Sequence, residues 1–267
     1  MEYKKFIEVA LEEVSEIARN SFGKVIGTTK EGDNNQVLTE TDLIIGKTLI
    51  KMIQKEYPEH NIIDEEAGVI DKKSEFTWVV DPIDGTSNFA NGLPFYGIMI
   101  GLLEKDVPIA GGVALPGFFE LYIAEKGHGA YCNGEKISVT KEIDLKNSLV
   151  IYGIDGHREN PDITRQECKL LAEIVLNIRN LRVSNTAFDC AMVAKGKYGA
   201  FLNQTTKIWD NVAQQIIIEE AGGVYTDFFG SKIDYSNSLE KANINFTCLA
   251  TSPALHSALL EIIKKNE

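Results

Sequence analysis

The sequence predicts a globular fold of mixed α+β and α/β class, and three observations support this. Helical periodicity marks the first two segments, and five short apolar runs follow them as expected strands. After about residue 146, strand-like and helix-like segments alternate, which is typical of an α/β arrangement. No linker rich in Ser, Pro or Gly separates the halves, 1–146 and 147–267, so we expect one intimately packed unit of 267 residues.

The N-terminal half should open with two helices. Apolar residues recur at helical spacing over residues 6–18, and this helix should end near Gly23. A second apolar stripe predicts a helix over residues 41–57, with Asp42 in its first turn. Asn133-Gly134 marks a tight hairpin turn. Five apolar runs between these features are predicted as strands: 61–63, 76–80, 95–103, 109–115 and 119–124.

In the C-terminal half, strands and helices should alternate along the chain. Its predicted strands are 149–152, 181–183, 198–202 and 246–250. Its predicted helices are 163–178, 186–195 and 211–221. A last helix should begin at Pro253 with Ser252 as its N-cap, because Ser favours the cap and Pro the first helical position.

Composition and charge exclude several classes of function. A formal net charge of -12 disfavours nucleic acid and acidic membranes as partners, since both are bound mainly through Lys and Arg. The sequence shows neither a signal peptide nor an apolar run long enough for a membrane span, so we expect a cytoplasmic protein. The scattered cysteines and histidines predict no zinc cluster or redox pair, and we assign the histidines no chemistry: Cys132, Cys168, Cys190, Cys248, His60, His128, His157 and His256.

Three acidic clusters are expected where a strand or loop meets a helix: 64–66, 81–86 and 209–210. In the middle cluster, Asp81 should emerge at the end of a buried strand and converge with Asp84. Pro82 fixes the backbone between them and leaves the Ile83 carbonyl without a competing donor. Two carboxylates and a carbonyl make an all-oxygen site for a hard cation such as Mg²⁺.

A phosphate could bind beside this cation. Gly85 lacks the Cβ that would block a ligand, and Thr86, Ser87 and Asn88 could open a helix with free N–H groups. Taken alone, Asp84-Gly85-Thr86 could equally be an ordinary turn. The combination with Trp78, Asp81 and Phe89 favours a functional site.

The segment Trp78-Val-Val-Asp-Pro-Ile-Asp-Gly-Thr-Ser-Asn-Phe89 resembles the W-x-x-D-P-I-D-G-T-x-N-F motif of the inositol monophosphatase family. The run from Trp209-Asp210 to Gly222-Gly223 is similar to that family's second motif, and Asp64-Glu65-Glu66-Ala67 to its D-E-E-A segment. The resemblance implies a layered α/β/α/β/α sandwich of the inositol monophosphatase and fructose-1,6-bisphosphatase type. It also implies a homodimer, two or three Mg²⁺ ions and inhibition by Li⁺.

The same resemblance implies roles for individual residues. Glu65, Asp81, the Ile83 carbonyl and Thr86 would surround the first metal and its nucleophilic water, and Asp81, Asp84 and Asp210 would hold the second. Asp42, in a segment similar to the family's V-T-x-x-D, would orient metal-activated water or a third metal. A water near Asp210 would protonate the departing alcohol. Glu66 is equally compatible with direct ligation and with an indirect or solvated role.

The substrate is a small phosphorylated metabolite, and inositol 1-phosphate is the first expectation. The family's ring-binding turn corresponds to Asn185-Thr186-Ala187, and Asn203 falls where inositol-specific enzymes carry Glu. The other substrate-binding residues that we expect are Asp84, Gly85, Thr86, Ser87 and Asp210.

Several alternatives stay open. The two departures, Asn185 and Asn203, leave fructose 1,6-bisphosphate, adenosine 3′,5′-bisphosphate and histidinol phosphate as other substrates. Arg158, Arg182 and Lys207 could serve a second anionic group or be solvated surface charges. A non-catalytic binding protein is a remote alternative, because the carboxylates of the motifs are all present.

Overall fold

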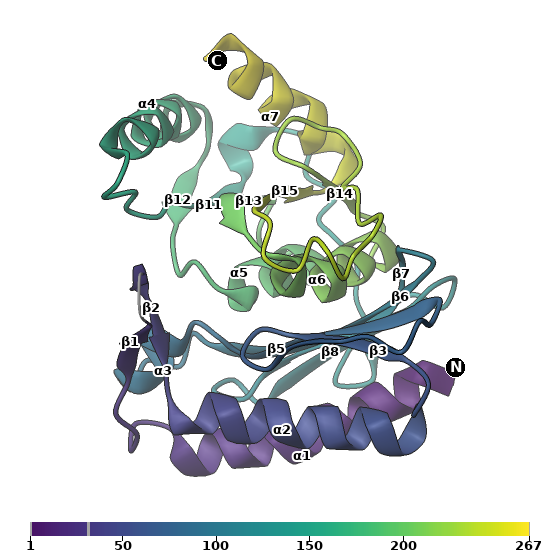
Figure 1. Cartoon of the computed structure of the whole chain (residues 1–267). Coiled ribbons are helices and arrows are strands. Elements are labelled where there is room, and N and C mark those ends of the chain that lie inside the picture. Colours follow the sequence, from purple (N-terminus) through teal and green to yellow (C-terminus); the bar gives the residue numbers. More distant parts are fainter. Residues whose placement is uncertain (1, 31–32, 267) are drawn as a thin grey trace.

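The computed structural model describes residues 2–30 and 33–266, and its elements stack in five layers (Figure 1). Helices α1 (Glu2–Ser21) and α2 (Glu40–Glu56) cover the outer face of a large sheet. Helices α5 (Ala187–Ala194) and α6 (Ile208–Glu220) lie between this sheet and a second one, whose outer face carries α4 (Pro161–Asn177) and α7 (Pro253–Lys265). The predicted α/β/α/β/α sandwich is confirmed.

The first sheet has eight strands in the order β10-β9-β8-β7-β6-β5-β3-β4. Its neighbours are antiparallel except for the parallel pair β3 and β5. The strands are β3 (Asn61–Asp64), β4 (Gly68–Ile70), β5 (Phe76–Asp84), β6 (Gly97–Glu104), β7 (Val107–Leu115), β8 (Glu120–Glu125), β9 (Ala130–Cys132) and β10 (Glu135–Lys136). A separate hairpin joins β1 (Thr28–Lys30) to β2 (Asp33–Leu38), and the short helix α3 (Thr86–Ala90) follows β5.

The second sheet has five strands in the order β12-β11-β13-β15-β14. Strand β11 is parallel to both of its neighbours, whereas β15 is antiparallel to both of its own. The strands are β11 (Leu149–Gly153), β12 (Asn180–Arg182), β13 (Ala200–Thr206), β14 (Val224–Thr226) and β15 (Phe246–Thr251), and a 3₁₀ turn, η1 (Leu145–Asn147), precedes them.

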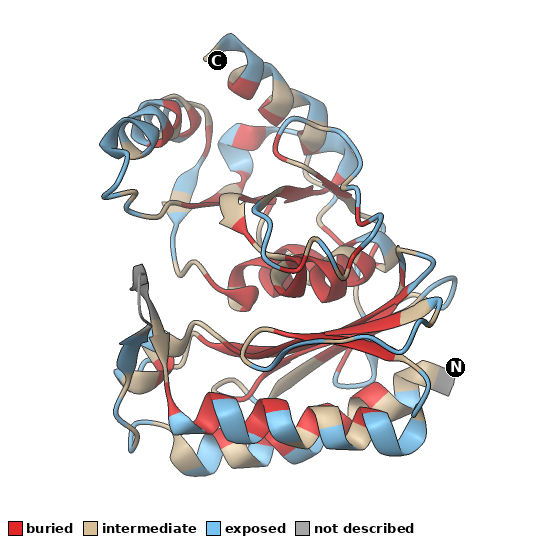
Figure 2. Cartoon of the chain, in the orientation of Figure 1, coloured by how far each residue is buried: buried red, intermediate tan, exposed pale blue. Residues whose placement is uncertain are grey.

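Helix α6 lies against the first sheet at a pair of glycines. Gly101 of β6 and Gly111 of β7 are directly opposite each other in the ladder. A Cβ on Gly101 would lie 2.9 Å from the Ala213 nitrogen, and one on Gly111 would lie 2.9 Å from the Ala213 Cα. The helix backbone therefore rests directly on the sheet, and Figure 2 shows that α6 is buried almost all round.

A bulge in β5 aims two aspartates at the same side of the sheet. Side chains three residues apart in a regular strand point to opposite faces. Asp81 pairs with Met99 and Asp84 with Gly97, so two residues of β5 face one of β6 between these pairs. The extra residue brings the side chains of Asp81 and Asp84 to the same face of the sheet. Pro82, which has no N–H for the ladder, lies within the bulge.

The structure differs from the sequence predictions in four places. The 64–66 cluster ends β3 and leads through a turn into β4, so no helix follows it. Helix α6 begins at Ile208, three residues before the predicted start, which puts Asp210 inside its first turn. Ser252 occupies the N-cap position of α7, but its side chain makes no capping hydrogen bond. Strands β1, β2, β4, β9, β10 and β14 were not among the predicted strands, although the turn between β9 and β10 was.

Two further observations concern the predicted absences. The four cysteines form no disulfide, and all except Cys168 are buried. Within residues 2–30 and 33–266, none of the helices has the length and apolar character that crossing a membrane requires.

Candidate active site

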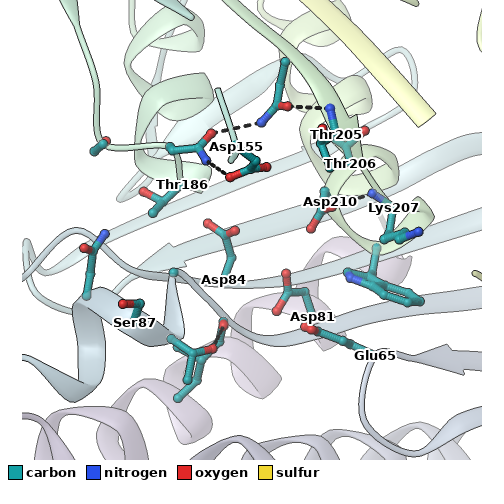
Figure 3. Close-up of a pocket in the computed structure, with 18 of the residues that line it drawn as sticks. Glu65, Asp81, Asp84, Ser87, Asp155, Thr186, Thr205, Thr206, Lys207 and Asp210 are labelled. Atoms are coloured by element: carbon teal, nitrogen blue, oxygen red, sulfur yellow. Dashed lines mark hydrogen bonds between the residues drawn. The ribbon is translucent and has the colours of Figure 1, made fainter. Parts of the chain in front are cut away.

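A cavity of about 400 Å³ lies where the two halves meet, at the ends of β5 and β13 (Figure 3). Because β3 and β5 run parallel, their carboxyl ends bring Glu65 and Asp81 to one edge of the first sheet. The carboxyl ends of the parallel strands β11 and β13 face this edge from the second sheet. Eleven of the predicted site residues line the cavity: Glu65, Asp81, Ile83, Asp84, Gly85, Thr86, Ser87, Asn185, Thr186, Asn203 and Asp210.

Three carboxylates converge in this cavity. Asp81, Asp84 and Asp210 each offer an oxygen, and these oxygens all lie within 4.8 Å of one another. Asp210 is the third residue of α6, where its carboxylate accepts a hydrogen bond from the Lys207 N–H in a capping box. The cap fixes the direction of Asp210, so the start of α6 completes a cluster whose other members come from the β5 bulge.

Without a counter-charge, the negative charges of these three buried carboxylates destabilise the folded protein. Burial raises the pKa of Asp81 well above its ordinary value, and the charges of Glu65, Asp84 and Asp210 raise it further. Burial, followed by the charge of Asp210, likewise raises the pKa of Asp84. Burial also raises the pKa of Asp210 to about 6. A bound cation would favour the charged form of all three groups.

The residues present fit a divalent metal ion. Asp81 is 1% exposed, and its Oδ1 is buried without a hydrogen-bond partner among the described residues. A buried carboxylate oxygen in that state is rare unless an ion or water satisfies it. Glu65 and the Ile83 carbonyl line the same cavity and would complete an oxygen ligand set of the kind that Mg²⁺ prefers.

Thr86 connects the cavity to Asp42. Its hydroxyl lies 2.7 Å from the Ile83 carbonyl oxygen and 3.0 Å from Asp42 Oδ1. Asp42 is 1% exposed, and its other oxygen accepts hydrogen bonds from the N–H and hydroxyl of Thr39. Asp42 therefore lies behind Thr86 and does not line the cavity, so it would act through the Thr86 hydroxyl.

Two predicted features of the substrate site differ in the structure. Ala187 does not line the cavity, and its N–H donates to the Asp84 carboxylate. The space beside Gly85 holds protein atoms, because a Cβ there would lie 2.6 Å from Thr186 Cγ2 and 3.0 Å from the Phe95 carbonyl oxygen. The glycine therefore permits close packing of the two halves in addition to leaving the cavity open.

Gly85→Ala should destabilise the fold more than Gly127→Ala. The two glycines have nearly the same backbone conformation, φ +79° and +78°, so both substitutions cost about 1 kcal/mol of backbone strain. A Cβ at Gly127 meets nothing within 4 Å, whereas the one at Gly85 clashes, which adds roughly 1–3 kcal/mol. Urea unfolding of the metal-free proteins measures the difference, and equal free energies of unfolding for the two variants would contradict the clash.

The three basic residues that could serve a second anionic group are not arranged for it. Arg158 and Arg182 are exposed and do not line the cavity. Lys207 lines it, but its ammonium donates to the Asn243 carbonyl at 2.9 Å. Glu66 lies outside the cavity, beside a smaller one under α2.

The sequence predictions missed several polar residues of the cavity wall, among them Asp155 and His157. The sequence analysis assigned His157 no chemistry, and the structure places it in the cavity wall. Both follow β11, which is central in the parallel part of the second sheet. Ligands of α/β sheets bind beyond the carboxyl ends of parallel strands, so polar residues directly after the 149–152 strand were the available signal.

Comparisons with known proteins agree with this geometry. A sequence model of the inositol monophosphatase family matches residues 2–267. The chain is 32% identical over 267 residues to the Aquifex aeolicus protein named fructose-1,6-bisphosphatase/inositol-1-monophosphatase, covering 98% of this chain and 96% of that one. It is 31% identical over 241 residues to inositol monophosphatase 1 of Bos taurus, covering 88% and 87%. The solved structure of the Thermotoga maritima IMPase matches with a TM-score of 0.87 at 26% identity, covering 100% of this chain and 98% of that chain.

Proposed function

The chain belongs to the inositol monophosphatase family and is a phosphoric monoester hydrolase, and we propose that it hydrolyses inositol 1-phosphate with the help of Mg²⁺. The observation that carries the proposal is the convergence of Asp81, Asp84 and Asp210 within 4.8 Å. Hard divalent cations prefer carboxylate and carbonyl oxygens, and this cavity offers both.

Bound metal ions would supply an acidified water and positive charge that stabilises the entering and leaving oxygens. The protein's own residues do the rest. The ions would be held by Asp81, Asp84, Asp210, Glu65 and the Ile83 carbonyl. The Thr86 hydroxyl lies between Ile83 and Asp42. Its oxygen can accept a proton from a water molecule while its own proton passes to the Asp42 carboxylate.

The site also explains how an acidic protein binds a phosphate ester. The metal-holding carboxylates are part of the formal net charge of -12. Once they are neutralised by cations, the cavity attracts a phosphate dianion that the bare protein would repel. A non-catalytic role is disfavoured, because the carboxylates of all three motifs meet in one cavity.

Removing divalent cations should abolish activity. Phosphate release from inositol 1-phosphate should fall to background with EDTA and return with Mg²⁺, because the ions supply both the electrophile and the nucleophilic water. Family resemblance adds the expectation that Li⁺ inhibits. Turnover that persists in EDTA would contradict the metal mechanism, whereas insensitivity to Li⁺ would contradict only that last expectation.

Fructose 1,6-bisphosphate is the second candidate substrate. The observation that favours it is the similarity to the Aquifex aeolicus protein, whose name includes that activity. Assays on both substrates, with adenosine 3′,5′-bisphosphate and histidinol phosphate beside them, rank the candidates by kcat/KM. A homodimer and a cytoplasmic location stay predictions from the sequence.

A further inference from the structure

A buried carboxylate lies behind the C-terminal wall of the cavity. Glu167 is 3% exposed and shares the inner stripe of α4 with Leu170 and Ile174, which are apolar. Its Oε2 is buried without a hydrogen-bond partner among residues 2–30 and 33–266. Burial raises the pKa of Glu167, although the charge of His157 counteracts this. A carboxylate in this place stabilises the fold less than an apolar side chain would, so packing does not account for it.

The imidazole of His157 connects this carboxylate to the cavity. Its Nε2 lies 3.7 Å from Glu167 Oε2 and 3.5 Å from the Thr205 hydroxyl oxygen. His157 lines the cavity, and its side chain keeps 26% of its surface exposed. One edge of the ring therefore meets Glu167 and Thr205, and part of the ring stays accessible to a ligand.

The loop that carries His157 is attached to the same helix as Glu167. The hydroxyl of Thr164, in the first turn of α4, accepts the His157 N–H at 2.9 Å and donates to the Asp155 carbonyl oxygen at 3.2 Å. Thr205, labelled in Figure 3, belongs to β13, which is parallel to β11. Contacts from α4 and from β13 thus fix the imidazole before a substrate binds.

These contacts determine which ring nitrogen a ligand can use. An ionised carboxylate only accepts hydrogen bonds, so Glu167 favours the proton on Nε2 of His157. In the neutral imidazole Nδ1 then carries a lone pair, and no residue in the described part of the chain pairs with it. Asn203 Oδ1 already accepts the Thr205 N–H at 2.7 Å, so it is not the acceptor that a Glu at this position would be. Nδ1 of His157 can supply that acceptor.

The other polar groups of this wall also suit hydroxyl groups. Asn185, Asn203 and Thr205 line the cavity with two amides and a hydroxyl, which both donate and accept hydrogen bonds. Asn203 Nδ2 donates to Asn185 Oδ1 at 3.0 Å, which holds the two amides together. The hydroxyl groups of a polyol likewise donate and accept, whereas an alcohol without them would leave this wall without partners.

We propose that His157 binds a hydroxyl group on the alcohol part of the substrate through Nδ1, and that Glu167 is a positioning residue that orients the imidazole. This rests on the proposed phosphatase function and names the substrate class of that site, a phosphate monoester of a hydroxyl-rich alcohol. Inositol 1-phosphate and fructose 1,6-bisphosphate both belong to this class.

Steady-state kinetics with Mg²⁺ tests the proposal on these two compounds and on p-nitrophenyl phosphate, whose alcohol has no further hydroxyl. The variants are His157→Phe, which keeps a planar ring without nitrogens, Glu167→Gln, which keeps the shape without the charge, and the double variant. The controls are His256→Phe, a histidine whose Nε2 lies 3.1 Å from the Thr226 hydroxyl, and Glu173→Gln, a half-buried carboxylate of α4. Neither control residue lines the cavity.

His157→Phe should raise KM for the two hydroxyl-rich substrates by about 5- to 20-fold, the effect of losing one hydrogen bond, with kcat and p-nitrophenyl phosphate hydrolysis little changed. Glu167→Gln should raise the same KM values by about two- to fivefold, and it should have no further effect in the His157→Phe background, because it acts through the imidazole. Both control variants should keep the wild-type KM values.

Thermal unfolding without metal separates positioning from a structural role. Since the pKa of Glu167 is raised in the folded protein, its ionisation above pH 4.5 lowers the free energy of unfolding. Glu167→Gln removes that cost and should be at least as stable as wild type at pH 7, although its KM is higher. A residue that served only the fold would lose stability instead.

The inference would be overturned by a His157→Phe enzyme whose KM for both hydroxyl-rich substrates stays within about twofold of wild type. An equal rise of KM for p-nitrophenyl phosphate would overturn it too, because the effect would then concern the phosphate or the metal site. Glu167→Gln would have no positioning role if it changed KM equally with and without His157, or if it lowered stability. A wild type that releases no phosphate from any of the three compounds would overturn the proposed function itself, and this is measured before any variant is made.

Discussion

Asp84→Asn should lower kcat by roughly three orders of magnitude, because it removes one of the three converging carboxylates that would hold metal ions worth several kcal/mol to the transition state. The substitution keeps the shape of the side chain and an oxygen that can still accept the Ala187 N–H. Phosphate release from inositol 1-phosphate at saturating Mg²⁺ measures the loss. Asp210→Asn should behave similarly, with an additional effect on the start of α6, whose cap it weakens.

The same variant should be at least as stable as wild type without metal. The pKa of Asp84 is raised in the folded protein, so between 3.8 and that raised value the native state binds more protons than the unfolded chain. The free energy of unfolding then falls as pH rises through this window, so a cost is present at neutral pH. Asn removes the cost, so its advantage should be seen at pH 7 and vanish below about pH 4.

The control for Asp84→Asn is Asp144→Asn, an exposed aspartate whose carboxylate likewise accepts a backbone N–H, from Lys146. It should change neither turnover nor the gain in melting temperature on adding Mg²⁺ and phosphate, whereas Asp84→Asn should reduce that gain. An Asp84→Asn protein that is less stable than wild type without metal at pH 7 would show that Asp84 has mainly a structural role.

Thr86→Val should lower kcat by about two orders of magnitude with a much smaller change in KM. Valine preserves the branched shape but removes the hydroxyl that joins the Ile83 carbonyl to Asp42 Oδ1, and proton transfer by a positioned group typically contributes this much. It also leaves the buried Asp42 carboxylate with one hydrogen bond fewer, so a loss of about 1–3 kcal/mol in stability should accompany it.

Thr48→Val is the matched control for Thr86→Val, because Thr48 is half-buried on α2 and its hydroxyl donates to a backbone carbonyl, that of Ile44. Its kcat should equal that of wild type. If Thr86→Val retained full kcat, the hydroxyl would have no part in moving the proton, and Asp42 would be a structural residue of the α2 cap.

The sequence predicted the parts of this fold whose signals are local. Helices α1 and α2 have clear apolar stripes, and the Asn133-Gly134 turn adopts positive φ at both residues, +49° and +82°, as its sequence requires. Strands β4 and β14 have three residues each, too few for a periodic pattern to stand out. Part of β13 was missed because its polar end, Asn203 to Thr206, contributes to the cavity wall and lacks the hydrophobic pattern of a strand.

In the candidate site, too, the residues in local motifs were predicted and those that depend on distant contacts were not. Carboxylates in short motifs with Pro and Gly were identified because their residue types serve few purposes other than metal or turn chemistry. Asp155 carried no such mark, since a single aspartate in a loop is ordinary until the strand before it is known to lie parallel to β13. The absence of Ala187 from the cavity wall depends on a contact with Asp84, 103 residues earlier, which spacing along the chain cannot reveal.

The glycine pair under α6 has a consequence for how this enzyme tolerates sequence change. Asp210 stands three residues before Ala213, the point where α6 touches Gly101 and Gly111. The distance between α6 and the sheet therefore determines the distance between Asp210 and the two aspartates of β5. A methyl group added at Gly101 would alter catalysis by changing that gap, although the residue touches neither metal nor substrate. Substitutions of Gly101 and Gly111 should thus impair catalysis as well as the packing of the core.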